Sequence, residues 1–160
     1  MLLFRLFAFL LVLFTLSIAD TPADKKFTER LRYIERTVPK ITPVKLRKWI
    51  KYEKDFILLD VRDPNELSAG YIDAGEYMKI SRGKLEFAAI KNKRLPQDRT
   101  IVVFCKSGSR GALATQLLRE YGYKKVYNLL GGLEGWIEAG FTIETPLGTF
   151  RQVPESELDS

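Results

Sequence analysis

The residue of this chain best suited to chemistry is its single cysteine, Cys105. It directly follows the apolar run Ile101–Phe104, and the segment Lys-Ser-Gly-Ser-Arg comes immediately after it. The β-branched and aromatic content of the run is typical of a buried strand. Apolar residues then recur at helical spacing from Leu113 until Gly122. The pattern therefore predicts a nucleophile at a turn between a strand and a helix.

A sulfur anion would be stabilised at such a turn. The first N–H groups of a helix lack intrahelical partners, and the helix dipole favours negative charge beside them. Lys106 and Arg110 add two cations close to the cysteine. We therefore expect Cys105 to react as a thiolate.

The alternative is that the cysteine is simply a small buried hydrophobe. A structural cysteine gains nothing from the small and polar residues Ser107, Gly108 and Ser109 directly after it. A loop that binds an anion, in contrast, needs small residues for its curvature and a cation such as Arg110 to close it. The segment from Lys106 to Arg110 is therefore predicted to bind the substrate.

The residue types that the sequence lacks exclude several classes of enzyme and of metal site. The chain has no histidine, which excludes a Cys-His protease, a histidine-ligated metal site and a Ser-His-Asp triad. A single cysteine also excludes a Cys-x-x-Cys redox pair, and we expect neither a metal nor a cofactor. Two classes remain, namely sulfur transfer through a cysteine persulfide and phosphate-ester cleavage through a thiophosphate.

Loop length separates these two classes. Cysteine phosphatases enclose a phosphoryl group in a Cys-x5-Arg loop, whereas four residues separate Cys105 from Arg110 here. The smaller loop suits a single outer sulfur atom better than a phosphoryl group. The loop also holds no carboxylic acid that could protonate a leaving alcohol. Sulfur transfer is the favoured class, and a cysteine-dependent phosphatase is the less favoured alternative.

The elements that must position Cys105 alternate along the chain. Apolar runs predict strands at 56–59, 77–80, 101–104 and 126–129, and helical spacing separates them. Strands that alternate with helices indicate an α/β fold with a central parallel sheet flanked by helices. We expect this domain to cover residues 41–145. Residues 20–40 are predicted to form a leading helix or a partly ordered arm, and the tail 146–160 has no recognisable pattern.

Composition is that of an ordinary globular protein with one domain. The 160 residues are 46% hydrophobic and 29% charged, with a formal net charge of +6. The basic residues are scattered among acidic ones, which favours small anions over nucleic acid as partners.

Residues 1–19 resemble a secretory signal. Arg5 precedes the apolar run Leu6–Phe14, and Ser17-Ile18-Ala19 offers the small residues that a signal peptidase recognises. We expect cleavage near Ala19 and a periplasmic or secreted protein, with an uncleaved membrane anchor as the alternative. A lone thiol in an oxidising compartment is a candidate for chemistry or for intermolecular pairing.

Several stretches together resemble the single-domain rhodaneses, a family of sulfurtransferases. The resemblance runs from about Ile41 to Thr145 and rests on Asp60–Glu66, Ala69–Ile72, Arg82-Gly83, the Cys105 loop and Gly131–Trp136. It implies that Cys105 carries a sulfane sulfur held by loop amides. It also implies small anionic donors such as thiosulfate, polysulfide or other persulfides, and cyanide or thiols as acceptors.

The resemblance extends to residues outside the loop. Arg62 and Arg82, with Arg110, fall at positions that can ring the pocket and attract anionic donors in similar rhodaneses. For Arg62 the alternative is a structural pair with Asp60 near the site. Trp136 is expected to belong to the core near the site rather than to the site itself.

The chain departs from the family pattern in two places. Tyr71–Gly75 stands where the family usually has His-Ile-Pro-Gly-Ala, and Gly111 stands where a serine is common. We expect the first change to affect packing and the second to affect the first turn of the helix after the loop.

The sequence does not distinguish an enzyme from a carrier. An exported protein with one cysteine could ferry a persulfide to a membrane enzyme instead of turning over free substrates. The oligomeric state and the physiological donor and acceptor are also left open.

Overall fold

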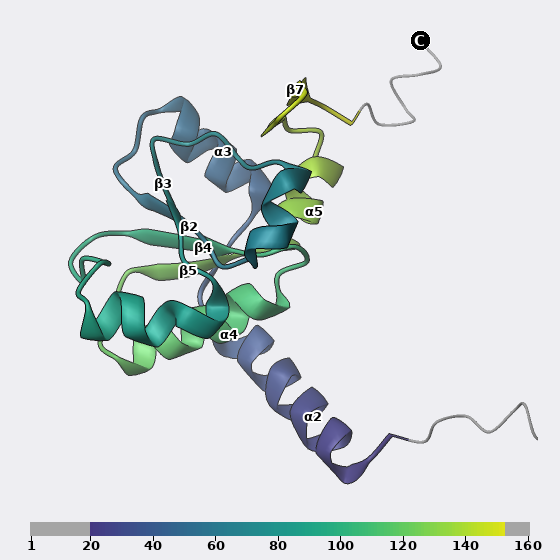
Figure 1. Ribbon diagram of the computed structural model, residues 1–160, viewed down its shortest axis with the longest axis vertical. Coiled ribbons are helices and arrows are strands. Elements are labelled where there is room, and N and C mark those ends of the chain that lie inside the picture. The colour runs from purple at the N-terminus through teal and green to yellow at the C-terminus, as the bar shows by residue number, and fades with distance from the viewer. Residues whose placement is uncertain (1–19, 153–160) are drawn as a thin grey trace, which may run out of the picture. The chain divides into compact units, whose positions relative to one another are not determined.

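Five parallel strands form the central sheet of the computed structural model, which describes residues 20–152 (Figure 1). The strands are β1 (Lys40–Ile41), β2 (Ile57–Asp60), β3 (Glu76–Lys79), β4 (Ile101–Phe104) and β5 (Val126–Leu129). Their order across the sheet is β1-β5-β4-β2-β3. The predicted parallel α/β fold is confirmed, and the expected signal sequence lies outside the described residues.

Side chains of the middle strands alternate between the two faces of the sheet. Ile57 and Leu59 pack on one face, and Leu58 packs on the other. All four residues of β4 are buried. Strands covered on both faces read as continuous apolar runs, which is why the sequence pattern was informative here.

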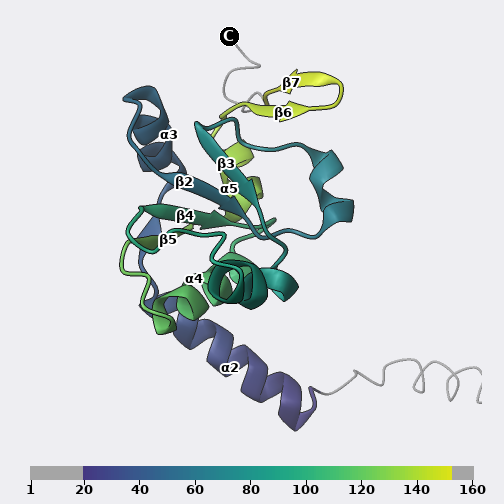
Figure 2. The same ribbon diagram turned by 60° about the vertical axis from the view of Figure 1, so that its left-hand side comes forward.

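Helices cover both faces of the sheet (Figures 1 and 2). On one face lie α3 (Pro43–Lys51) and α5 (Gly132–Glu138). On the other lie α4 (Ser109–Glu120) and the wide-turned π-helix η3 (Glu86–Lys91). Two short 3-10 helices, η1 (Pro64–Ala69) and η2 (Arg82–Lys84), follow β2 and β3.

Capping and packing residues explain where the first two helices, α2 and α3, form. The side chain of Thr42 caps α3 by accepting a hydrogen bond from the Lys45 N–H at 3.2 Å, and Pro43 occupies the first turn. The expected leading helix is α2 (Pro22–Thr37), and Ile34 near its end packs with Val38 against Ala112. Among residues 20–152, no helix is both long and apolar enough to span a bilayer.

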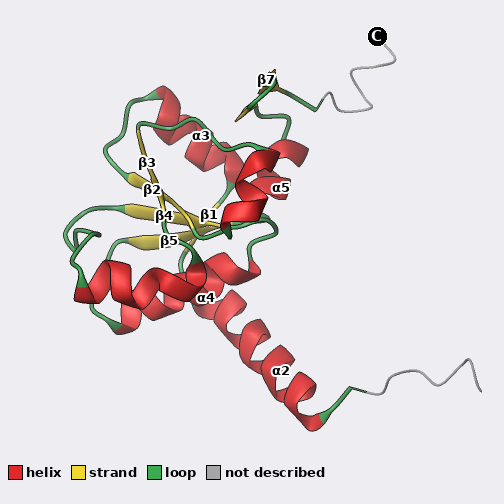
Figure 3. Cartoon of the chain, in the orientation of Figure 1, coloured by secondary structure: helices red, strands yellow, loops and turns green. Residues whose placement is uncertain are grey.

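Residues 146–150 are more regular in structure than their sequence indicates. The strands β6 (Ile143–Thr145) and β7 (Gly148–Phe150) form an antiparallel hairpin (Figure 2). Figure 3 colours the chain by type of secondary structure. All three residues of β7 are exposed, so burial imposes no alternation that a sequence pattern could show. Backbone pairing between Tyr71 and Glu144 ties the hairpin to the turn after η1.

Candidate active site

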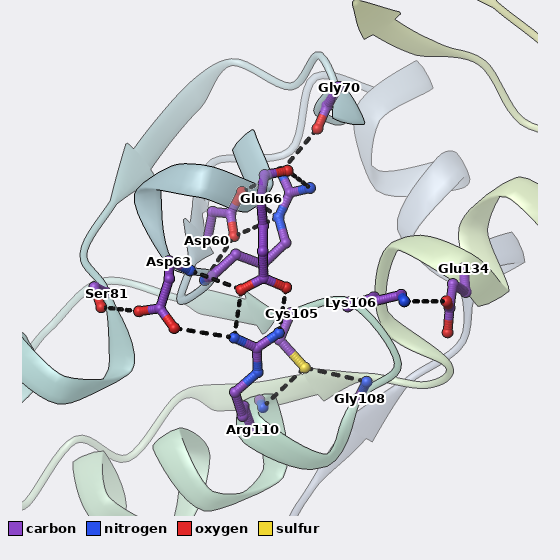
Figure 4. A network of polar contacts seen from close by, with 12 residues as sticks. Asp60, Asp63, Glu66, Gly70, Ser81, Cys105, Lys106, Gly108, Arg110 and Glu134 are labelled. Carbon is purple, nitrogen blue, oxygen red and sulfur yellow. Dashed lines mark hydrogen bonds and ion pairs between the residues drawn. The ribbon is translucent and has the colours of Figure 1, made fainter. Parts of the chain in front are cut away.

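Cys105 lies at the carboxyl end of β4, and α4 begins at Ser109, as the sequence predicts. The cysteine is 1% exposed. Its Sγ accepts hydrogen bonds from the backbone N–H groups of Gly108 at 3.2 Å and Gly111 at 3.4 Å (Figure 4). The amides of the turn therefore point at the sulfur, in the arrangement that stabilises an anion at a helix N-terminus.

The amino end of α5 donates backbone hydrogen bonds to the start of the Cys105 loop. The N–H of Leu133 donates to the Cys105 carbonyl at 2.9 Å, and that of Glu134 donates to the Lys106 carbonyl at 3.0 Å. A Cβ on Gly132 would lie 2.5 Å from the Cys105 carbonyl oxygen, so the two backbones approach too closely for any side chain. Gly132 also has a φ of +59°, a conformation that favours glycine.

Asn128 of β5 is a site residue that sequence reasoning missed. It is 4% exposed, and its Nδ2 donates to the Gly108 carbonyl at 3.1 Å. A Cβ on Gly111 would lie 2.3 Å from Asn128 Oδ1, which explains why a glycine stands where a serine is common in the family. An asparagine within an otherwise apolar strand was the signal that could have revealed it.

Arg110 does not stand free beside the thiol. Its Nη1 and Nη2 lie 2.5 Å from the two carboxylate oxygens of Glu66, and its Nη1 lies 3.5 Å from Asp63 Oδ2. The Glu66 carboxylate raises the pKa of Arg110. In return, the hydrogen bonds from Arg110 lower the pKa of Glu66 to about 2. The expected cation is present in the loop, but a carboxylate that the sequence reading did not include balances its charge.

Glu66 reaches Arg110 because η1 holds it there. The backbone N–H of Asp63 donates to Glu66 Oε2 at 3.0 Å, which completes a capping box at the start of η1. The sequence signature of this motif is an acidic residue, here Asp63, with a glutamate three positions after it, here Glu66. The signal for the motif was in the sequence, but its contact with the loop was not.

The other polar side chains of the loop also point elsewhere. Lys106 lies 3.5 Å from Glu134 and is 65% exposed. Ser109 Oγ donates to Glu35 Oε1 at 2.7 Å, and the side chain of Ser107 is exposed. Within the segment predicted to bind substrate, the group that contacts the sulfur is the backbone N–H of Gly108, and no side chain of the segment donates a hydrogen bond to it. The side chains of Lys106 and Ser109 pair with carboxylates outside it.

Arg62 is part of the scaffold, as the alternative interpretation had it. Its guanidinium donates to Asp60 through Nε and Nη2 and to the backbone carbonyl of Gly70 at 2.8 Å. The side chain is 1% exposed, and that of Asp60 is fully buried. Burial lowers the pKa of Arg62, while the hydrogen bonds that it donates to Asp60 raise it, and the net direction is upward. The structural pair with Asp60, which the sequence left as the alternative, is present, and the attraction of donors by Arg62 stays a prediction.

The remaining predicted residues divide between the site's surroundings and the core. Arg82 lies on η2, and its buried Nε has no hydrogen-bond partner among the described residues. Trp136 is 2% exposed, and its Nε1 donates to the Thr142 carbonyl at 2.8 Å. It therefore belongs to the core, as expected.

Comparison with known proteins agrees with this geometry. The family model of the rhodanese-like domain matches residues 42–139. A sulfurtransferase of Allochromatium vinosum is 33% identical over 95 residues, which cover 59% of this chain and 84% of that protein. The solution structure of the polysulfide-sulfur transferase homodimer of Wolinella succinogenes has a TM-score of 0.63 and 36% identity, covering 76% of this chain and 89% of that one.

A longer relative matches over part of its length. The probable adenylyltransferase/sulfurtransferase MoeZ of Mycobacterium tuberculosis is 31% identical over 134 residues, which are 76% of this chain and 33% of that protein. The chain thus spans about a third of this relative. Because the family model covers more than half of its length, the chain belongs to the rhodanese-like domain family.

Proposed function

We propose that this protein is a sulfurtransferase that carries a sulfane sulfur atom on Cys105. The observation that carries the proposal is the pair of backbone N–H groups directed at Cys105 Sγ from the turn between β4 and α4. The names of the relatives from Allochromatium vinosum and Wolinella succinogenes support it.

The chemistry requires a thiolate and a place for one further sulfur. The Cys105 thiolate attacks the outer sulfur of a donor such as thiosulfate, polysulfide or another persulfide, and a new S–S bond forms. The old S–S bond of the donor breaks, and its electron pair leaves with sulfite or with the shortened chain. Cyanide or a thiol then attacks the outer sulfur of the persulfide, and the Cys105 thiolate is released. Amides at the start of α4 stabilise the negative charge in both steps.

Loading and turnover together test this function. Protein incubated with polysulfide or thiosulfate should gain the mass of one sulfur atom, and Cys105→Ser should gain none. Steady-state transfer from thiosulfate to cyanide should then depend on Cys105. Stoichiometric loading without turnover would favour a persulfide carrier, and equal loading of the serine variant would overturn the proposal.

The same preparations distinguish the phosphatase alternative. A phosphoryl group carries three equatorial oxygens in its transition state and needs several converging donors, whereas two amides contact the sulfur here. Aryl-phosphate hydrolysis should therefore be negligible. Hydrolysis faster than sulfur transfer would exclude the sulfurtransferase.

A further inference from the structure

The helix α3 has a basic outer surface. Its exposed cations are Lys45, Arg47, Lys48 and Lys51. The sequence has no acidic residue between Glu35 and Glu53. Within residues 20–152, none of the ion pairs includes any of these four cations. No carboxylate partner therefore offsets the positive charge that α3 presents to solvent.

The position of each residue along α3 decides which side faces outward. Leu46 is fully buried, and the partly buried Ile50 packs into the same core cluster. Successive residues of an α-helix are rotated by about 100° around its axis. Lys48 and Lys51, two and five positions after Leu46, consequently lie on the side of the helix away from the core.

Two exposed apolar side chains lie among these cations. Val44, two positions before Leu46, is 54% exposed, and Tyr52 is 73% exposed. The Nζ of Lys51 lies 5.8 Å from the centroid of the Tyr52 ring. We call this surface the α3 face and define it by Val44, Lys45, Arg47, Lys48, Lys51 and Tyr52. A partner that suits the whole face combines negative charge with apolar groups directly beneath it.

The types of residue on the α3 face favour a lipid surface over an acidic protein. Three of its four cations are lysines, and a lysine is a point charge on a flexible stem without a fixed hydrogen-bonding geometry. Interfaces between proteins are enriched in arginine and depleted in lysine. The anionic headgroups of a membrane attract clusters of basic residues through charge alone, and tyrosine is enriched at the boundary between headgroups and acyl chains.

We propose that the α3 face binds the surface of a membrane that contains anionic lipids. The four cations contact headgroup phosphates, and the side chains of Val44 and Tyr52 enter the boundary layer below them. Binding is peripheral, because the apolar side of α3 already packs into the core through Leu46. Cys105 takes no part in this contact, so the proposal does not depend on sulfur transfer.

Sedimentation of the full chain with lipid vesicles tests the proposal. Vesicles of phosphatidylcholine are compared with vesicles that also contain phosphatidylglycerol, at low and at high salt. The apolar run Leu6–Phe14 carries no charge and is present in every variant, so the difference between the two kinds of vesicle reports on basic residues. The wild type should bind more tightly to the anionic vesicles, and added salt should remove this preference because it screens exposed charges.

Charge reversal on the α3 face should abolish the preference. The triple variant Arg47→Glu/Lys48→Glu/Lys51→Glu should bind the anionic vesicles roughly a hundredfold more weakly than the wild type. The double variant Val44→Ser/Tyr52→Ser should also bind more weakly, with an unchanged dependence on salt.

The matched control reverses three exposed charges on other elements. Lys84→Glu/Lys91→Glu/Lys124→Glu changes the net charge by the same amount as the triple variant. It should keep the affinity of the wild type within about threefold, because membrane attraction acts only within a Debye length of the surface.

Chemical acetylation of the wild type locates the contact without relying on the folding of any variant. Anionic vesicles should protect Lys45, Lys48 and Lys51 from acetylation and leave Lys91 and Lys124 reactive. Equal binding to the two kinds of vesicle, an equal loss in the control variant, or unprotected lysines on α3 would overturn the proposal. Protection of these lysines by poly-glutamate but not by vesicles would also overturn it, and would assign the face to an acidic protein.

Discussion

At the scale of single residues, the groups that contact the Cys105 sulfur are uncharged backbone amides, and the charged side chains of the loop pair with other residues. Backbone N–H groups of Gly108 and Gly111 touch Cys105 Sγ, while the cations of the loop face carboxylates. Arg110 and Glu66 form a bidentate pair, the geometry in which a partly exposed ion pair contributes most. The pair holds η1 against the loop and keeps Arg110 in one orientation.

This pair predicts a particular response to acid. The pKa of Glu66 is lowered from 4.5 to about 2 in the folded protein, so the pair stabilises the fold fully above pH 4.5. That contribution is lost as the pH falls from 4.5 toward about 2, because the folded state must then bind a proton at a cost. In urea unfolding series, Glu66→Gln should show a shallower loss of stability across this range.

The expected difference is about 1 kcal/mol or less, since the Glu66 side chain is 24% exposed and partly screened by solvent. Glu138→Gln removes an exposed carboxylate that takes part in no ion pair within residues 20–152, and it should follow the wild type. Parallel curves for wild type and Glu66→Gln would show that the ion pair contributes nothing to the fold.

At the scale of elements, the cysteine loop is shaped from two sides. The strand β4 and the helix α4 carry it, and the amino end of α5 donates two backbone hydrogen bonds to it from behind. Gly132 makes this approach possible, since its missing side chain leaves room for the carbonyls of Cys105 and Lys106. The geometry of the sulfur site thus depends on an element that begins 27 positions after the cysteine.

A Cβ at position 132 should therefore damage both fold and function. Gly132→Ala combines a positive φ with contacts of 2.5 and 2.6 Å to two backbone oxygens, neither of which can rotate away. We expect a loss of about 1–3 kcal/mol in the free energy of unfolding. Persulfide loading measured by mass spectrometry should fall with it.

The control for this variant is Gly75→Ala. A Cβ there would meet nothing within 4 Å, and the variant should keep wild-type stability and loading. Wild-type behaviour of Gly132→Ala would mean that α5 does not constrain the loop.

At the scale of the whole molecule, the parallel sheet brings two loops to one edge. The strands β2 and β4 are neighbours with Asp60 opposite Phe104, so the residues after each strand emerge side by side. Ligands of open α/β sheets bind outside the carboxyl ends of the strands. The contact between η1 and the Cys105 loop follows from this arrangement.

The hypothesis of export also concerns the whole chain. The short apolar run and the small residues before Asp20 predict cleavage near Ala19. Expressed in full in a bacterium with two membranes, the protein should appear in the periplasm with an N-terminus at or near Asp20. Replacing Leu11 by arginine should keep it unprocessed, because a charge interrupts the apolar region.

N-terminal sequencing of the fractions decides the outcome. Recovery of the uncleaved chain in the membrane fraction would favour the anchored alternative. An uncleaved chain in the cytoplasm would show that residues 1–19 are not an export signal.

The sequence by itself determined the parts of this protein that local patterns encode. A continuous apolar run predicted β4 and helical spacing predicted α4, and the structure confirms both. The position of Cys105 at their junction was also predicted, and its reactivity stays a prediction. The same reasoning predicted the parallel sheet, because buried strands alternating with helices have few other arrangements. The exposed hairpin β6–β7 was missed, since no burial pattern marks it.

Only the tertiary structure decided which charges meet. Arg110 and Glu66 are 44 positions apart, and their contact depends on β2 lying next to β4. Arg62 has the same residue type as Arg110, yet it is buried against Asp60 while Arg110 faces the loop. Residue types and spacing do not contain this difference, because the partner of a long charged side chain is set by the packing of elements that are distant in sequence.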